Sequence, residues 1–119
     1  MKKIALFAAL LVCVFAFHFL ISLAQGGASC PNLLPTRLIV RERARVVNGD
    51  PSPLNVREGA GTDHVRLGNI PVSGVFYVLS GFECTEQYTW YRVDYRGLVG
   101  WVAEGSDEGY FVEPYPLGG

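Results

Sequence analysis

The stretch that decides the fold is YTWYRVDYRGLVGWVA, at residues 88–103. Aromatic and β-branched residues dominate it, which is typical of β-strands. Side chains alternate along residues 88–95, so this strand presents two different faces. One face carries Tyr91, Val93 and Tyr95, and the other carries Trp90, Arg92 and Asp94. Arg96 and Gly97 then form a tight hairpin signal, and residues 98–103 are expected to return as a second strand.

Further short segments of strand character lie on both sides of this hairpin. They are residues 38–47, 54–57, 65–70, 75–79 and 110–112. Between them we expect a turn at 48–53 and loops at 58–63, 80–87 and 104–109. After the first 24 residues, no 11-residue window keeps a helical period. The fold class is therefore predicted to be all-β, a small barrel of about five to seven short strands. Closure of such a barrel would remove most exposed strand edges.

The chain of 119 residues begins with an apolar leader. Lys2 and Lys3 precede an almost unbroken hydrophobic run at residues 4–23, expected to form a helix. Ser22 and Ala24 are small residues at the positions that signal peptidase requires. The run is also long enough to span a bilayer, so residues 1–24 are either a cleaved signal peptide or a retained signal anchor. Both alternatives place residues 25–119 outside the cytoplasm, secreted or anchored through residues 4–23.

Composition excludes several functional classes. The formal net charge is −1, and residues 25–119 alone carry −3. A nucleic-acid partner attracted by bulk positive charge is therefore not expected. About 95 residues leave room for one small domain and not for a multidomain enzyme. Aromatic residues make up 13% of the chain, which argues against disorder.

Two cysteines remain after the leader, Cys30 and Cys84. In a small exported domain such a pair most often forms a disulfide, which we predict here. The alternative, a cysteine nucleophile working with His64, needs a reduced thiol and a third orienting group. No paired metal-ligand motif exists, so neither a metal nor a cofactor is expected.

Five short motifs resemble the bacterial SH3-like (SH3b) domain family. They are LNVREGAG at residues 54–61, GxIP at 68–71, FxVL at 76–79, WYRVxY at 90–95 and GWV at 100–102. Each motif is weak alone, but all five follow in the family's order and spacing. The resemblance implies an SH3-like barrel over residues 44–115, preceded by an arm at 25–43 and followed by a tail at 116–119. Gly100 is expected to let a neighbouring side chain pack close to the backbone.

The resemblance implies a non-catalytic module that binds cell-wall peptides or proteins. Relatives bind peptides in a shallow groove lined by aromatic rings, which offer area at low entropy cost. The candidate ligand-binding residues are Trp90, Trp101, Tyr77, Tyr95 and Tyr110, with Arg57, Arg92 and Asp94 at the polar rim. The alternative for the aromatic residues is packing inside the barrel. The arm from Cys30 to Pro35 could also fold over the groove and bury it.

Two charged segments have a structural and a functional interpretation. The arginines at 37, 41, 43 and 45 either contact anionic wall polymers or headgroups, or protect a solvated strand edge. Glu104, Asp107, Glu108 and Glu113 are expected to lie in a solvated loop, because their spacing does not suit calcium. Gly59 and Gly61 are expected to serve turn geometry and not a phosphate loop, because no helix follows.

The sequence thus predicts a non-enzymatic extracytoplasmic binding module. Its expected ligand is a cell-wall peptide of peptidoglycan or an envelope protein. The membrane is expected as a partner only through the N-terminal segment, if that is retained. The alternative is a membrane-anchored accessory protein whose barrel docks to another chain.

Overall fold

The predicted hairpin lies at the centre of the structure. The computed structural model describes residues 29–47 and 53–115. The predicted leader helix and residues 1–28, the centre of the 48–53 turn and the C-terminal tail lie outside the described residues. Arg96 and Gly97 have φ angles of 52° and 91°, and Tyr95 pairs with Leu98 across the turn. Positive φ at both central residues belongs to the type I′ turn, so the predicted hairpin is confirmed.

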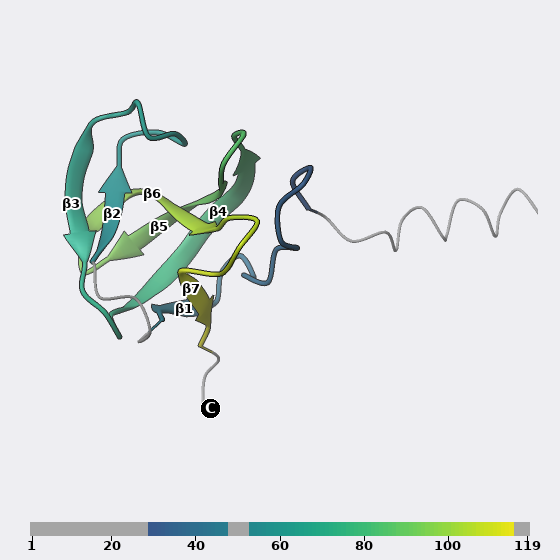
Figure 1. Cartoon of the computed structure of the whole chain (residues 1–119). Helices are drawn as coiled ribbons and strands as arrows, with labels where there is room; N and C mark the ends of the chain where they lie inside the picture. The colour runs from purple at the N-terminus through teal and green to yellow at the C-terminus, as the bar shows by residue number, and fades with distance from the viewer. Residues whose placement is uncertain (1–28, 48–52, 116–119) are drawn as a thin grey trace, which may run out of the picture.

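In the described part of the chain, seven strands form one antiparallel sheet in the order β3-β2-β6-β5-β4-β1-β7. They are β1 (Arg43–Val46), β2 (Leu54–Arg57), β3 (Arg66–Ile70), β4 (Val75–Cys84), β5 (Thr89–Tyr95), β6 (Leu98–Gly105) and β7 (Val112–Pro114). The sheet curls so that its two end portions face each other around a common interior (Figure 1). The described residues contain no helix, and in them no helix is long and apolar enough to cross a membrane. The all-β, barrel-like prediction is confirmed for this part of the chain.

The core is built mainly from aliphatic side chains, together with the rings of Phe76 and Tyr91. It contains Leu38, Ala44, Val46, Val56, Ile70, Phe76, Val78, Tyr91, Val93, Val102 and Val112. Tyr91 and Val93, which were predicted to share one face of the strand, both lie in this cluster. Tyr95, the third residue of that face, packs against it. Burial of these side chains is the main term that stabilises a domain of this size.

Several predicted element boundaries are wrong. β6 extends to Gly105, into the predicted loop 104–109, and β7 covers Val112–Pro114 and not residues 110–112. Residues 80–84 belong to β4 and not to a loop, since Ser80 pairs with Arg92 and Cys84 with Thr89. Two bulges interrupt this ladder, so inward-facing and outward-facing residues do not alternate regularly along β4. The sequence pattern therefore does not indicate this part of the strand. Only residues 43–46 of the predicted segment 38–47 form a strand.

The arginine-rich strand β1 is not an edge. It pairs with β4 on one side and with β7 on the other, so the prediction of a protected edge there is wrong. Arg45 forms a salt bridge with Glu113 of β7, and the Arg37 guanidinium lies 3.6 Å from the centre of the Tyr110 ring. Among the described residues, the strands with only one neighbour are β3 and β7. Hydrogen-bonded closure of the barrel, which would leave no such edges, is therefore not observed.

The segment before β1 packs against the sheet. Leu38 lies in the core, and its carbonyl accepts a hydrogen bond from the Tyr91 hydroxyl at 3.4 Å. Leu34 N donates to the Ser106 carbonyl at 3.1 Å, and the Tyr110 hydroxyl donates to the Pro35 carbonyl at 2.6 Å. Residues 34–38 therefore contribute to the folded unit.

Glu104 is buried, contrary to the expectation of a solvated acidic loop. Its side chain is 1% exposed, and Oε2 accepts hydrogen bonds from Arg37 N at 2.7 Å and Leu38 N at 3.2 Å. Within the described part of the chain, Oε1 has no hydrogen-bond partner. Burial raises the pKa of this carboxyl, and the two N–H donors partly oppose that rise. Asp107 and Glu108 are exposed, as predicted.

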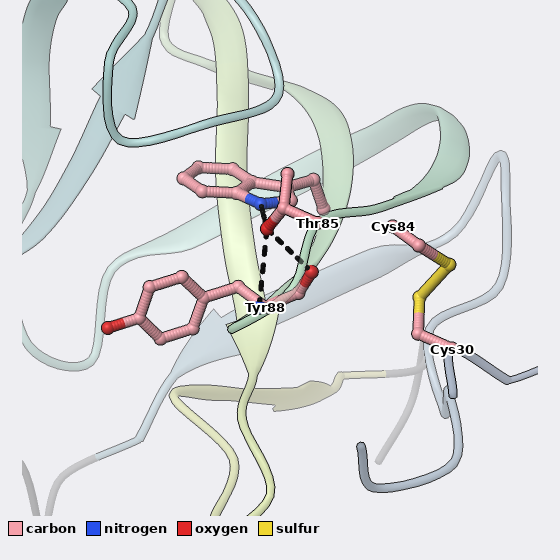
Figure 2. The surroundings of a disulfide bond; sticks show 5 residues. Cys30, Cys84, Thr85 and Tyr88 are labelled. Carbon is pink, nitrogen blue, oxygen red and sulfur yellow. Dashed lines mark hydrogen bonds between the residues drawn. A yellow bond between two sulfur atoms is a disulfide. The ribbon is translucent and has the colours of Figure 1, made fainter. Parts of the chain in front are cut away.

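The predicted disulfide is present between Cys30 and Cys84, whose Cα atoms lie 5.5 Å apart. It joins the N-terminal segment to the end of β4. Figure 2 shows Thr85 and Tyr88 beside this bond, at the turn between β4 and β5. Thr85 Oγ1 accepts from Tyr88 N at 3.3 Å and from Trp90 Nε1 at 2.9 Å, so the turn also fixes the indole.

Candidate binding groove

Most of the predicted ligand-binding residues lie on the outer face of the sheet. Directly opposite residues in antiparallel strands share a face. Arg57 pairs with Trp101, and Trp101 pairs with Arg92. Asp94 follows Arg92 by two residues and pairs with Tyr77 of β4. The outer face therefore presents these five side chains from β2, β6, β5 and β4.

Trp90 lies on the same outer face but is largely covered. It pairs with Ala103 of β6, two residues before Arg92 on β5. Its side chain is only 2% exposed, because it packs edge-on against Tyr88 with ring centres 5.9 Å apart and bonds to Thr85. Tyr88 in turn lies 5.8 Å from the Phe111 ring. An aromatic cluster of Tyr88, Trp90 and Phe111 thus forms a second layer outside the core.

A hollow opens beside this cluster, which we call the Trp90 hollow. It has a volume of about 200 Å³. Its lining consists of Pro53, Leu54, Asn55, Arg57, Thr62, Tyr88, Trp90, Ala103 and Phe111. β6 lies between β2 and β5 in the sheet. Because the Ala103 side chain is short, it leaves space between the side chains of β2 and those of the aromatic cluster. The hollow therefore owes its depth to an alanine where β6 could hold a large residue.

A larger hollow adjoins the first. It has a volume of about 940 Å³ and shares Tyr88 and Phe111 with the Trp90 hollow. The remaining lining is Asn32, Leu33, Val47, Glu86, Gln87, Ser106, Asp107, Glu108, Gly109 and Tyr110. Three of these residues are acidic and none is basic, so we call it the acidic hollow. Together the two hollows form one groove with an aromatic centre, Arg57 at one end and carboxylates at the other.

The N-terminal segment borders this groove without filling the Trp90 hollow. Asn32 and Leu33 line the acidic hollow, and Leu34 is bonded to Ser106 at its border. None of residues 30–35 lines the Trp90 hollow. The described part of the arm therefore forms a wall of the groove.

The three predicted tyrosines lie in three different places. Tyr77 is exposed on the outer face opposite Asp94. Tyr95 packs against the core from the inner face, beside the hairpin turn. Tyr110 lines the acidic hollow and stacks under Arg37. The structure thus separates Tyr95 from the groove and brings Tyr110 into it.

The chemical groups of the site include no free cysteine among the described residues. Both cysteines of the described chain are joined in the disulfide, which leaves neither of them as the thiolate partner considered for His64. Within residues 29–47 and 53–115, no three metal-ligating side chains gather in one place. The groove offers aromatic faces, an arginine and carboxylates, which recognise ligands through contact area and charge.

Sequence reasoning missed Tyr88, Phe111 and Ala103. Tyr88 and Phe111 were assigned to strand segments, and nothing local indicates that their rings meet over Trp90. Ala103 is paired with Trp90 in the ladder, so knowledge of the register would have identified it. A small residue that pairs with a buried tryptophan in the neighbouring strand indicates such a hollow.

The comparisons with known proteins agree with the geometry. Residues 52–107 match the family model described as Bacterial SH3 domain. No curated protein and no solved structure matches the chain. The matched segment contains β2 to β6, which carry most of the Trp90 hollow and the whole Arg57–Trp101–Arg92 row. Residues 52–107 are therefore similar to a bacterial SH3 domain, in agreement with the five motifs.

Proposed function

We propose that this protein is an extracytoplasmic binding module that holds an extended peptide, of the cell wall or of an envelope protein, in the groove. Bacterial SH3 domains are generally non-catalytic binding modules. Such domains and the Cys30–Cys84 disulfide are consistent with a location outside the cytoplasm. The signal segment at residues 1–24 belongs to the same proposal.

The observation that supports this proposal is the hollow over Ala103. Aromatic rings of Tyr88, Trp90 and Phe111 line it from one side, and the polar side chains of Asn55 and Arg57 line it from the other. Aromatic rings anchor a ligand through apolar contact, while neighbouring polar groups fix its orientation. Trp90 is held by Thr85 and Tyr88, so its ring is ordered before a ligand arrives.

The test is to fill the hollow. In Ala103→Leu the added side chain occupies the space that the peptide needs, so binding should weaken at least about tenfold. The probes are purified peptidoglycan, assayed by co-sedimentation, and soluble peptide fragments released from it. The protein is the full chain with its disulfide formed. In the Trp101→Phe background, Trp90 is the only tryptophan, and its fluorescence reports ligand entry into the hollow.

The matched control is Ser80→Leu, which adds the same side chain at an exposed position of β4 outside the hollow. It should bind like the wild type. Circular dichroism and thermal unfolding establish that both variants remain folded. Binding that is equal in Ala103→Leu and wild type contradicts the groove. Failure of the wild type to bind either probe would contradict the cell-wall peptide and favour docking to a protein partner.

A further inference from the structure

Three arginines and a tryptophan form one line across the outer face of the sheet. Arg66 of β3 pairs with Arg57 of β2, Arg57 with Trp101 of β6, and Trp101 with Arg92 of β5. We call this line the arginine row. Since neighbouring strands lie about 4.8 Å apart, it spans roughly 15 Å. The sequence does not reveal it, because its members are scattered over residues 57–101.

Within residues 29–47 and 53–115, no ion pair neutralises the charges of the row. The ion pairs there join Arg45 to Glu113 and His64 to Asp63. Arg57 donates one hydrogen bond, to the His64 carbonyl at 3.0 Å. Asp94, on the same face, accepts from Gly97 N at 2.8 Å. Three guanidinium groups on a chain of net charge −1 thus concentrate positive charge on one face.

The row contains one large apolar side chain, that of Trp101. Val65 and Leu67 flank Arg66 in the chain, but successive strand residues point to opposite faces, and Leu67 Cδ1 lies near Gly100 on the inner face. Trp101 is half-buried between Arg57 and Arg92. β3 pairs only with β2, so its other side is unpaired among the described strands. Arginine and tryptophan are the residues that protein interfaces favour, and an unpaired strand edge lies beside them.

We propose that the arginine row is a docking surface for an acidic peptide segment of a partner protein. Guanidinium groups bind carboxylates through paired hydrogen bonds, so glutamate or aspartate side chains of the partner would lie over Arg66, Arg57 and Arg92. An apolar side chain of the same segment would cover Trp101, between Arg57 and Arg92. Arg57 belongs to both surfaces, but Arg66 and Arg92 do not line the Trp90 hollow, so the row extends beyond the peptide groove and can be tested through these two residues.

The test uses the full oxidised chain and a short fluorescein-labelled peptide that alternates glutamate with valine. Fluorescence anisotropy should show binding that weakens with added salt. Arg66→Ala and Arg92→Ala should each weaken it about tenfold, because each removes a charge-assisted contact. The matched control is Arg96→Ala, which removes an equally exposed charge at the β5–β6 turn, away from the row, and should leave binding unchanged.

Additional binding measurements identify the class of partner and distinguish binding at the arginine row from binding in the groove. The glutamine counterpart of the peptide should not bind, and inorganic polyphosphate should bind more weakly than the glutamate peptide. Ala103→Leu should bind the glutamate peptide like the wild type, whatever its effect on peptidoglycan fragments. The proposal is overturned if the glutamate peptide does not bind, if Arg66→Ala and Arg92→Ala lose no more than Arg96→Ala, or if polyphosphate binds equally well.

Discussion

At the scale of single residues, Glu104 links the N-terminal segment to the sheet. A buried carboxylate is stable only when hydrogen bonds compensate for lost hydration, and here two backbone N–H groups supply them to one oxygen. The other oxygen has no partner among the described residues, which is consistent with a carboxyl that holds its proton more tightly than usual. Titration of this one group should therefore influence stability.

The direction of that influence follows from linkage. Burial raises the pKa of Glu104 above its ordinary value of 4.5, so the folded state binds this proton more tightly than the unfolded state does. The contribution of this group to stability is fully present below pH 4.5 and is lost as the pH rises through the folded-state pKa. In Glu104→Gln this decline should be absent, because the amide keeps an acceptor for Arg37 N and Leu38 N but does not titrate.

Urea unfolding at a series of pH values measures this effect as the difference between wild type and variant. The difference isolates Glu104 from the other carboxyl groups. Glu108→Gln, at an exposed position, should follow the wild-type pH dependence. If the curves of wild type and Glu104→Gln run parallel above pH 4.5, the buried carboxyl does not titrate as the structure indicates.

At the scale of elements, the junction of β2 and β6 is the tightest point near the groove. A Cβ added at Gly100 would lie 2.6 Å from the Arg57 carbonyl oxygen and 2.6 Å from Val56 Cγ1. This close approach confirms the expectation for Gly100. β2 pairs with β6 through Arg57 and Trp101, so displacement of the Arg57 backbone would move one wall of the Trp90 hollow.

Gly100→Ala should lower the free energy of unfolding by about 1–3 kcal/mol, as overpacking of a close contact does. It should also weaken binding of peptidoglycan fragments, because Asn55 and Arg57 shift with β2. Chemical denaturation and Trp90 fluorescence in the Trp101→Phe background measure the two effects. Gly109→Ala is the control for stability, since an added Cβ there meets nothing within 4 Å. Equal stability of the two variants would mean that β2 can move away from β6 without cost.

Local pattern predicts some elements well and others poorly. The β5–β6 hairpin is predictable because alternation and an Arg-Gly turn coincide within sixteen residues. The continuation of β4 is not, because its bulges break the period and Gly81 has no side chain. A Cβ at Gly81 would lie 2.2 Å from Tyr91 Cδ1, so glycine is required there by a ring on the next strand. A requirement for glycine of this kind can be recognised only when the pairing register of the two strands is known.

At the scale of the whole molecule, the same limit applies to the site. Trp101, Arg57 and Arg92 were chosen separately as candidates, and only the sheet order brings them into one row with Arg66. Burial of Trp90 depends on Tyr88 and Phe111, which come from a turn and from the segment before β7. The chain thus encodes its strands locally and its binding surfaces through pairing between distant strands.

The disulfide acts at this largest scale, because it closes a loop over a sequence separation of 54 residues. In the chain-entropy model such a loop restricts the unfolded chain and stabilises the fold by about 4 kcal/mol. Noncovalent contacts of Leu38, Glu104 and Tyr110 hold the same N-terminal segment in place. The double variant Cys30→Ala, Cys84→Ala should therefore keep the native fold while losing most of that stability.

Urea unfolding of the double variant, and of the wild type after reduction, measures the loss. The two should agree within error, since both lack the same cross-link. Near-ultraviolet circular dichroism should retain the signal of the ordered Trp90 under native conditions, because Thr85 and Tyr88 still hold its ring. A loss below about 1 kcal/mol would mean that the unfolded chain is already restrained without the bond. Loss of the native signal would instead show that the noncovalent contacts of the N-terminal segment do not suffice to order the groove.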